Sequence, residues 1–250
     1  MCLLQKGWVR MWRSRLVLVS LSALLLGVSL QPILSRPALA QADSGSVIVS
    51  TSPDGQAGER LKEKFKASWP WYLTRASGLV AAVCLIVLML GGIGQITGHT
   101  FRLLDPLTAW ASHRALGITL AIAVLLHVVA LLFDKFVSFN IIDLLVPWLS
   151  SHRPVDIFGF HFGSLYVALG VIALYLILAV TITSLVWIEK KPARWKLIHL
   201  LSYFAVGMVF VHALFLGTDV STGIFKLVWI GINSVVLVAV LARLWRAYTI

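Results

Sequence analysis

Residues 113–133 read HRALGITLAIAVLLHVVALLF, and residues 197–216 read LIHLLSYFAVGMVFVHALFL. Each stretch has about the 20 residues that an α-helix needs to cross roughly 30 Å of hydrocarbon. Each contains two histidines, His113 and His127 in the first and His199 and His212 in the second. Apart from Arg114, neither stretch contains a Lys, Arg, Asp or Glu. Ionisable groups at membrane depth are costly, so four of them in matched pairs indicate a functional site.

The composition of the whole chain also indicates an integral membrane protein. Hydrophobic residues make up 59% of the 250 residues and charged residues only 12%, whereas a soluble domain carries about 25% charged residues. The formal net charge is +11, but the basic residues cluster at the ends of apolar runs, as membrane anchors do. We therefore expect membrane lipid, and no nucleic acid, as a partner.

The N-terminus has the pattern of an export signal. Basic residues precede the apolar run at 16–30, and Ala38-Leu39-Ala40 places small residues before Gln41, as at a cleavage site. The alternative is a retained first helix, because residues 16–34 are just long enough to span. Residues 1–40 are thus expected to be a signal peptide or a retained helix, followed at 41–71 by a polar outer leader with a short surface helix.

Five further apolar segments are long enough to span a membrane, near residues 72–94, 113–133, 163–188, 197–217 and 224–242. If the first begins outside, the C-terminus ends inside with a short tail at 244–250. The inner regions then carry Arg102, Arg114, Lys190, Lys191, Arg194, Lys196, Arg243 and Arg246, and the two later outer loops and their edges carry Lys135, Arg153 and Lys226. This bias supports the orientation, although the basic stretch at 59–66 does not follow it.

The sequence therefore predicts an all-α, multi-pass protein of the plasma (inner) membrane. The bundle has five spans plus the N-terminal apolar segment, or six spans if that segment is retained. In the outer connection, the apolar run at 136–145 is too short to span and is followed by Pro147, so we expect a helix lying at the membrane interface.

The spacing of the histidines predicts two levels of ligands. On an ideal helix, 14 residues rise about 21 Å and return to within about 40° of the same face, so His113 and His127 lie near opposite edges of the membrane. The 13-residue spacing in the other helix is about 140° short of four full turns. Gly207 lies between those two histidines and could permit local distortion. Because both helices run outward, the pairs that meet are His113 with His199 and His127 with His212.

Two imidazoles at each level suit the axial positions of a haem iron, whereas structural zinc requires four converging ligands. An iron with both axial positions filled has no open site, which favours electron transfer over oxygen binding. One alternative is a haem-free transport or structural protein in which the histidines relay protons or pack between helices. Another is a quinol-linked cytochrome of a different fold, which would need ligands on other helices.

Several short motifs accompany the histidines: Arg75-Ala76-Ser77-Gly78, His113-Arg114-Ala115-Leu116-Gly117, Val146-Pro147-Trp148, Trp195 to Tyr203, and His212 followed by Gly217-Thr218-Asp219. With these motifs the chain resembles the ferric reductase-like transmembrane domain family over residues 72–243. The family includes the membrane portions of NADPH oxidases and ferric reductases, and the haem-binding membrane subunit of bacterial periplasmic methionine sulfoxide reductase systems.

The resemblance implies two b-type haems that conduct electrons from a cytoplasmic donor to an outer acceptor. That acceptor is expected to be a periplasmic reductase partner, ferric iron or oxygen. The family usually has six spans, with ligands on the third and fifth. The residues after 243 leave no room for flavin and nicotinamide domains, and no G-x-G-x-x-G loop is present. The donor is therefore expected to be a separate protein, a flavin or a quinol, and the chain an oxidoreductase component.

Other side chains are weaker candidates for the site. Arg114 and Arg102 could contact the propionates of an inner haem, and Arg75 or Lys226 those of an outer haem, or they could be ordinary interface anchors. Trp195 and Tyr203 could pack against a porphyrin. His152 and His161 lie in the outer loop and could contact an acceptor or a metal ion, and His99 lies in the inner loop; solvated or interfacial roles are the simpler expectation for all three.

Overall fold

The structure is a computed structural model that describes residues 56–157 and 160–249. Five stretches within these residues are long and apolar enough to cross a membrane: Ser68–Thr97, Pro106–Leu132, Leu165–Val186, Pro192–Leu216 and Gly223–Ala247. The predicted five-span, all-α membrane bundle is therefore confirmed. The predicted signal segment at 1–40 lies outside the described residues.

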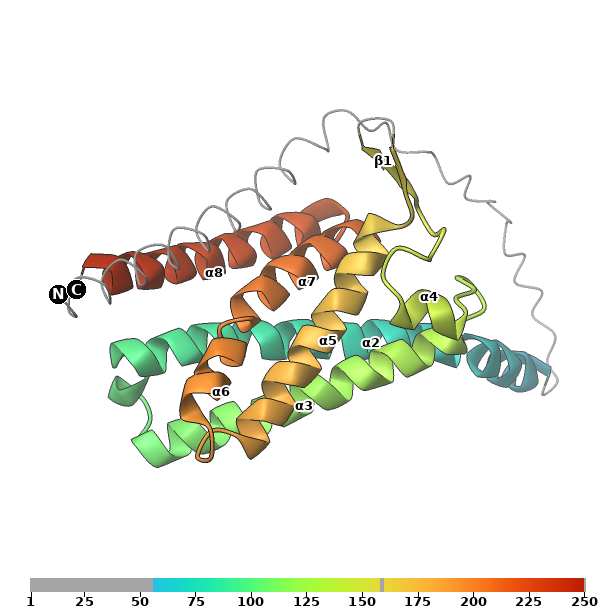
Figure 1. Cartoon of the computed structure of the whole chain (residues 1–250). Helices are drawn as coiled ribbons and strands as arrows, with labels where there is room; N and C mark the ends of the chain where they lie inside the picture. Colours follow the sequence, from blue (N-terminus) through green and yellow to red (C-terminus); the bar gives the residue numbers. More distant parts are fainter. Residues whose placement is uncertain (1–55, 158–159, 250) are drawn as a thin grey trace.

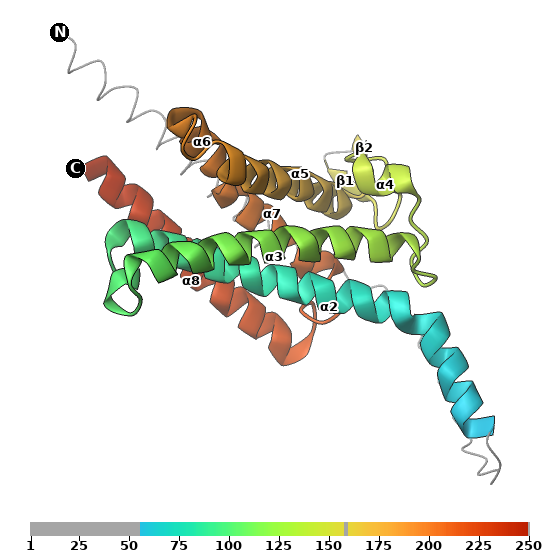
Figure 2. The ribbon, with the colours of Figure 1, turned by 90° about the horizontal axis from the view of Figure 1, so that it is seen from below.

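The helices that make up these spans are α2 (Gln56–Thr97), α3 (Pro106–Leu132), α5 (Leu165–Val186), α6 (Pro192–His199), α7 (Ser202–Leu216) and α8 (Gly223–Thr249). Figures 1 and 2 both show α2 lying along α3. Buried apolar side chains from several helices form the core of the bundle, including Leu85 of α2, Leu120 of α3, Ile177 of α5 and Val236 of α8. On the outside, side chains such as Val83 and Ile122 remain exposed, as expected for surfaces that face lipid.

Local signals in the sequence explain where two of the spans begin. Asp105 accepts a hydrogen bond from the backbone N–H of Thr108, and Pro106 occupies the first helical position of α3. These bonds from Thr108 hold the pKa of Asp105 below its usual value. At the start of α5, the Ser164 side chain accepts from the N–H of Val167. Both caps satisfy N–H groups that have no partner inside the helix.

Helix α2 extends well beyond the predicted first span. It runs for 42 residues and contains Pro70, so the surface helix expected in the leader is continuous with the span rather than separate. A proline within a helix removes one backbone hydrogen bond and bends the axis. Figure 2 shows the change of direction near the N-terminal end of α2.

The outer connection between α3 and α5 differs from the single interfacial helix expected at 136–145. Only α4 (Ile141–Leu145) is helical, and it begins at a capping box formed by Asn140 and Asp143. An unpredicted hairpin follows, in which β1 (Val155–Ile157) pairs antiparallel with β2 (Phe160–Phe162). The Tyr175 hydroxyl of α5 donates to the Leu145 carbonyl at 2.6 Å, which ties the end of α4 to the bundle.

A candidate site of two histidine pairs

The four histidines of the spans lie in two pairs between α3 and the α6–α7 segment. The imidazole centres of His113 and His199 are 6.2 Å apart, and those of His127 and His212 are 6.5 Å apart. These are the partners expected from the sequence. We call the first the inner pair and the second the outer pair, after the orientation predicted above. Along α3 the two levels are separated by about 21 Å.

A break between α6 and α7 brings the 13-residue spacing into register. The backbone N–H groups of Leu201, Tyr203 and Phe204 each bond to a carbonyl three residues earlier. Such 3₁₀ turns advance about 120° per residue instead of 100°, so they supply part of the missing rotation. The distortion is at Leu200–Leu201, whereas α7 continues through Gly207. The suggestion that Gly207 provides it is therefore wrong.

Each imidazole of the outer pair contacts a backbone carbonyl of a neighbouring helix, α2 for His127 and α5 for His212. His127 Nδ1 lies 2.9 Å from the Thr74 oxygen on α2, and His212 Nδ1 lies 2.8 Å from the Tyr166 oxygen on α5. A carbonyl can only accept, so Nδ1 carries the proton in both rings. The lone pair on Nε2 is then free to bind a metal ion, the arrangement usual for histidine ligands.

Glycines make room for these two rings. Gly78 and Gly170 each follow the accepting residue, Thr74 or Tyr166, by four positions and so lie above it on the same helix face. A Cβ added at Gly78 would lie 3.1 Å from His127 Nδ1, and one at Gly170 would lie 2.6 Å from His212 Nδ1. Helices α2 and α5 therefore share one arrangement: a backbone carbonyl contacts the histidine ring, and a glycine four residues later leaves space for that ring.

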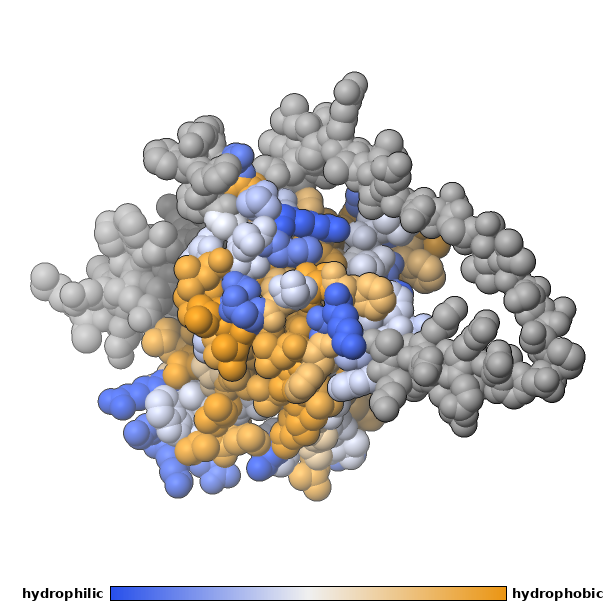
Figure 3. Space-filling model, turned by 90° about the vertical axis from the view of Figure 1, so that its right-hand side faces the viewer, coloured by the Kyte–Doolittle hydropathy of each residue, from blue (hydrophilic) through white to orange (hydrophobic). Residues whose placement is uncertain are grey.

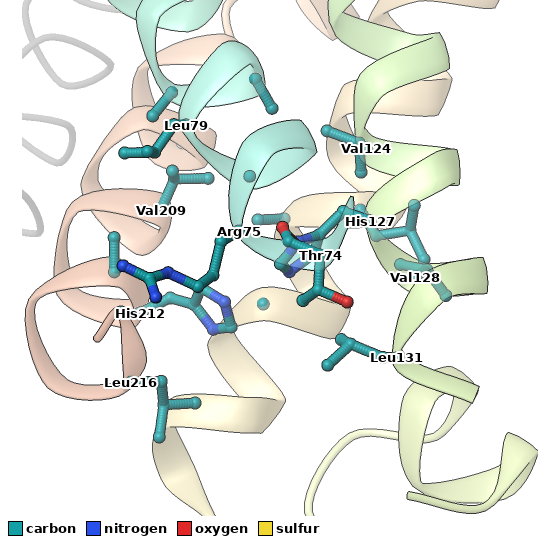
Figure 4. A pocket seen from close by; sticks show the side chains of 18 of the residues that line it. Thr74, Arg75, Leu79, Val124, His127, Val128, Leu131, Val209, His212 and Leu216 are labelled. Carbon is teal, nitrogen blue, oxygen red and sulfur yellow. Dashed lines mark hydrogen bonds between the residues drawn. The ribbon is translucent and has the colours of Figure 1, made fainter. Parts of the chain in front are cut away.

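The outer pair lines a cavity of about 260 Å³ (Figure 4). Its walls come from α2, α3, α5 and α7 and are mainly apolar, with Leu85, Val124 and Leu174 among the lining residues. Polar groups gather at the outer end, where Arg75, Asp134, His152 and Asp219 also line the cavity. Figure 3 looks onto this end of the molecule, where blue polar residues lie among the orange apolar ones.

Arg75 and Asp219 form an ion pair at the outer end of the cavity. Arg75 Nε donates to Asp219 Oδ2 at 2.8 Å, and a second guanidinium nitrogen contacts the other carboxylate oxygen. The guanidinium also stacks 4.0 Å from the centre of the Trp71 ring. Hydrogen bonding to Arg75 holds the pKa of Asp219 below its usual value. The pair joins α2 to the connection between α7 and α8.

The inner pair has different surroundings. His199 Nδ1 lies 3.3 Å from the Ser184 hydroxyl oxygen, which also accepts a hydrogen bond from Trp195 Nε1 at 3.0 Å. The Trp195 ring centre is 5.2 Å from that of His199. The His113 ring packs over Gly92, where an added Cβ would lie 3.3 Å away. Within the described residues, no hydrogen bond to the His113 ring is found.

The weaker candidates are more dispersed. The Arg114 guanidinium stands 5.5 Å from the Trp110 ring centre and its side chain is exposed, as is that of Arg102 at the end of the 3₁₀ helix η2 (Thr100–Arg102). Lys226 lies in α8 and does not line the outer cavity. The remaining loop histidines lie at separate places, His99 exposed beside Thr97 and His161 in β2 opposite Asp156.

His152, in contrast, lies at the outer end of the cavity. Its ring centre is 5.4 Å from that of Phe139, and burial together with the nearby Arg153 holds its pKa below the ordinary value.

The sequence did not reveal three residues that contact the histidine rings, Gly170, Gly92 and Ser184. Glycines within apolar helices cost about 1 kcal/mol relative to alanine, and this cost was the available signal of a close approach.

The chain matches one known family of membrane proteins. The family model described as "Ferric reductase like transmembrane component" matches residues 77–211, more than half of the chain. The match includes His113, His127 and His199 and ends one residue before His212. Searches of curated proteins and of solved structures give no significant match.

Proposed function

Because the chain belongs to the family of ferric reductase like transmembrane components, we propose that it carries electrons across the membrane on two b-type haems, each held by one histidine pair. Domains of this family in general bind haem. His113 and His199 would be the axial ligands at the inner level, and His127 and His212 those at the outer level. The haem-binding domain would occupy residues 72–243.

The separation of the rings carries this proposal. Two imidazoles that hold one metal ion between them, each at a metal–nitrogen distance of about 2.0–2.1 Å, would have ring centres roughly 6.4 Å apart. The observed separations are 6.2 Å and 6.5 Å. Within the described residues no group of three or more His, Cys, Asp or Glu could hold a metal ion. A macrocycle that supplies its own four equatorial nitrogens therefore suits two imidazoles better than a bare ion does.

When bound, haem iron supplies reversible one-electron chemistry. One histidine pair would hold the group at each level, and two backbone carbonyls fix the tautomers of the outer pair. The mainly apolar walls of the outer cavity would exclude water from a bound macrocycle. Arg75 lines that cavity and could reach an outer propionate, whereas Arg114 lies beside the inner ligand His113 in the sequence and could reach an inner one.

The direction of transfer follows from the predicted orientation. A cytoplasmic donor, which would be a separate protein, a flavin or a quinol, would deliver electrons near His113 and His199. They would leave near His127 and His212 toward an outer acceptor, which would be a periplasmic reductase partner, ferric iron or oxygen. The chain would then act as the membrane component of an oxidoreductase.

A proton relay through the same histidines is less well supported. It would need polar groups between the inner and outer levels, but the residues that line the cavity there are apolar, Leu120 and Val124 among them. In the outer pair, moreover, each Nδ1 proton is already donated to a backbone carbonyl.

The absorption spectrum and the haem-to-protein ratio of the purified protein test the proposal. We expect two haems per chain in the parent, and partial, spectrally distinct losses in His113→Ala and His212→Ala. His99→Ala is the matched control, because that histidine is exposed and outside both pairs. A parent protein that stays colourless despite ample haem supply would contradict the proposal.

A further inference from the structure

The two histidine pairs differ in what their Nδ1 atoms contact. In the outer pair both Nδ1 atoms lie within 2.9 Å of backbone carbonyls. In the inner pair His199 has a longer contact of 3.3 Å, to a hydroxyl that is already an acceptor for Trp195. The His113 ring has no hydrogen bond within the described residues. Both histidines of the outer pair thus have a close hydrogen-bond acceptor at Nδ1, whereas in the inner pair only His199 has one, and it is more distant.

The difference in the Nδ1 contacts would change the reduction potential of an iron bound to each pair. A hydrogen bond from the distal N–H of an imidazole to a strong acceptor makes the ring a better electron donor to the metal. A better donor stabilises the ferric form relative to the ferrous form and so lowers the reduction potential. Two carbonyl acceptors at the outer level lower the potential there, and the shared Ser184 hydroxyl does so less at the inner level.

Nearby charges act in the same sense. Positive charge favours the reduced iron, which has one positive charge fewer. Near the inner pair, Arg114 directly follows His113 and Lys196 lies three residues before His199, and both side chains are exposed. At the outer end Arg75 is balanced by Asp219, and Asp134 adds a further carboxylate to the cavity lining. Burial acts in the opposite sense, because the rings of the outer pair are more completely surrounded by protein than those of the inner pair. We give more weight to the ligand contacts and the nearby charges, which both favour a higher inner potential.

We propose that the two haems have unequal reduction potentials, with the inner one higher, and that Ser184 is the positioning residue that sets the inner potential through His199. This inference rests on the proposed function, because it requires a haem at each level. With Nε2 of His199 on the iron, Nδ1 carries the proton and the Ser184 oxygen accepts it. Trp195, which donates to the same oxygen, weakens that acceptor by occupying one of its lone pairs.

A potentiometric titration of the full-length protein in lipid nanodiscs, followed at the haem α-band, tests the inference. The parent should show two one-electron waves. Ser184→Ala removes the acceptor and should move only the upper wave, to higher potential. Ser184→Thr keeps a hydroxyl and should restore the parent value. The matched control is Ser234→Ala, which removes a hydroxyl that bonds only to its own helix at Ile230 and should move neither wave.

Trp195→Phe provides a test of opposite sign that leaves the hydroxyl in place. It frees the Ser184 oxygen to accept more strongly from His199, so the upper wave should move to lower potential. Two haems with coincident waves, or Ser184 and Trp195 variants that move the lower wave, both waves or neither, would overturn the inference and leave the proposed function intact. A parent without haem would instead overturn the proposed function itself.

Discussion

At the residue scale, the glycines beneath the histidines decide whether the rings can occupy their positions. A methyl group at Gly170 would lie 2.6 Å from two atoms of the His212 ring, closer than carbon atoms approach without repulsion. The same change at Gly78 would give 3.1 Å to His127, and at Gly92 3.3 Å to His113. The severity of the clash therefore decreases from Gly170 to Gly78 to Gly92.

Gly170→Ala is accordingly expected to displace the His212 ring and to remove about half of the bound haem. The backbone effect works in the other direction, since alanine within a helix is favoured over glycine by roughly 1 kcal/mol. The haem-to-protein ratio measures the loss. Gly91→Ala is the control, because nothing lies within 4 Å of its added Cβ. Full haem content and an unchanged spectrum in Gly170→Ala would show that the ring does not need this space.

The Arg75–Asp219 pair predicts a dependence of stability on pH. The pKa of Asp219 is lowered, chiefly by hydrogen bonding to Arg75. A carboxylate with a lowered folded-state pKa stabilises the fold above its unfolded value of about 3.9, and this contribution is lost as the pH falls through the folded-state pKa. The two side chains are 33% and 28% exposed, so solvent screening limits the contribution to about 0.2–1 kcal/mol.

Asp219→Asn should therefore lower the unfolding temperature at about pH 7, and the difference from the parent should shrink toward about pH 3. Thermal unfolding at a series of pH values in one detergent measures both differences. Asp143→Asn is a useful comparison, because that carboxylate caps α4 outside the cavity. A difference between Asp219→Asn and the parent that stays constant with pH would mean that the ion pair does not contribute.

At the element scale, the break between α6 and α7 aligns the second histidine of its segment. Inserting one alanine between Leu201 and Ser202 would turn α7 by about 100° and move it by about 1.5 Å relative to α6. We expect His212 to leave the outer pair while His199 stays in the inner pair, so that one haem remains. Haem content and the two-wave titration measure this. An equal insertion after Ala242, near the end of α8, should leave both haems in place.

Some of the secondary-structure elements could be predicted from the sequence, and others could not. The five spans could be recognised because length and hydropathy determine them locally, as could the two histidine levels on α3. The break at Leu200–Leu201 could not, because leucine is an ordinary helix former and the 3₁₀ turns are visible only in the backbone hydrogen bonds of the folded chain. Val155–Ile157 and Phe160–Phe162 alternate apolar and polar residues as strands do, but three residues are too few to distinguish a strand from a loop.

The histidine supports were also beyond the sequence, because they depend on contacts between distant segments. His127 and Thr74 are 53 residues apart, and His212 and Tyr166 are 46 apart. Gly78 appears in a motif quoted for the family resemblance, but its role is visible only when α2 lies against α3. Ser184 is an unremarkable residue in an apolar helix until α6 folds back and places Trp195 and His199 beside it.

At the scale of the whole molecule, the membrane potential would act together with the two haem levels. Each electron that moves from a negative inside to a positive outside gains about 2.3 kcal/mol per 100 mV. This gain would offset an uphill step from a higher-potential inner haem to a lower-potential outer one. An electron would then rest at the inner level in the absence of a membrane potential and move outward more readily when the membrane is energised.

This coupling depends on the orientation of the bundle, which can be measured directly. The basic residues at the ends of the later spans place the connection between α5 and α6 inside and the connection between α3 and α5 outside. In a Cys2→Ser background, Ser151→Cys should react with a membrane-impermeant thiol reagent in intact cells, and Lys190→Cys only after permeabilisation. Both positions are exposed, whereas Cys84 is buried and should stay unlabelled. The reverse pattern would place His113 and His199 at the outer side and turn the proposed electron path around.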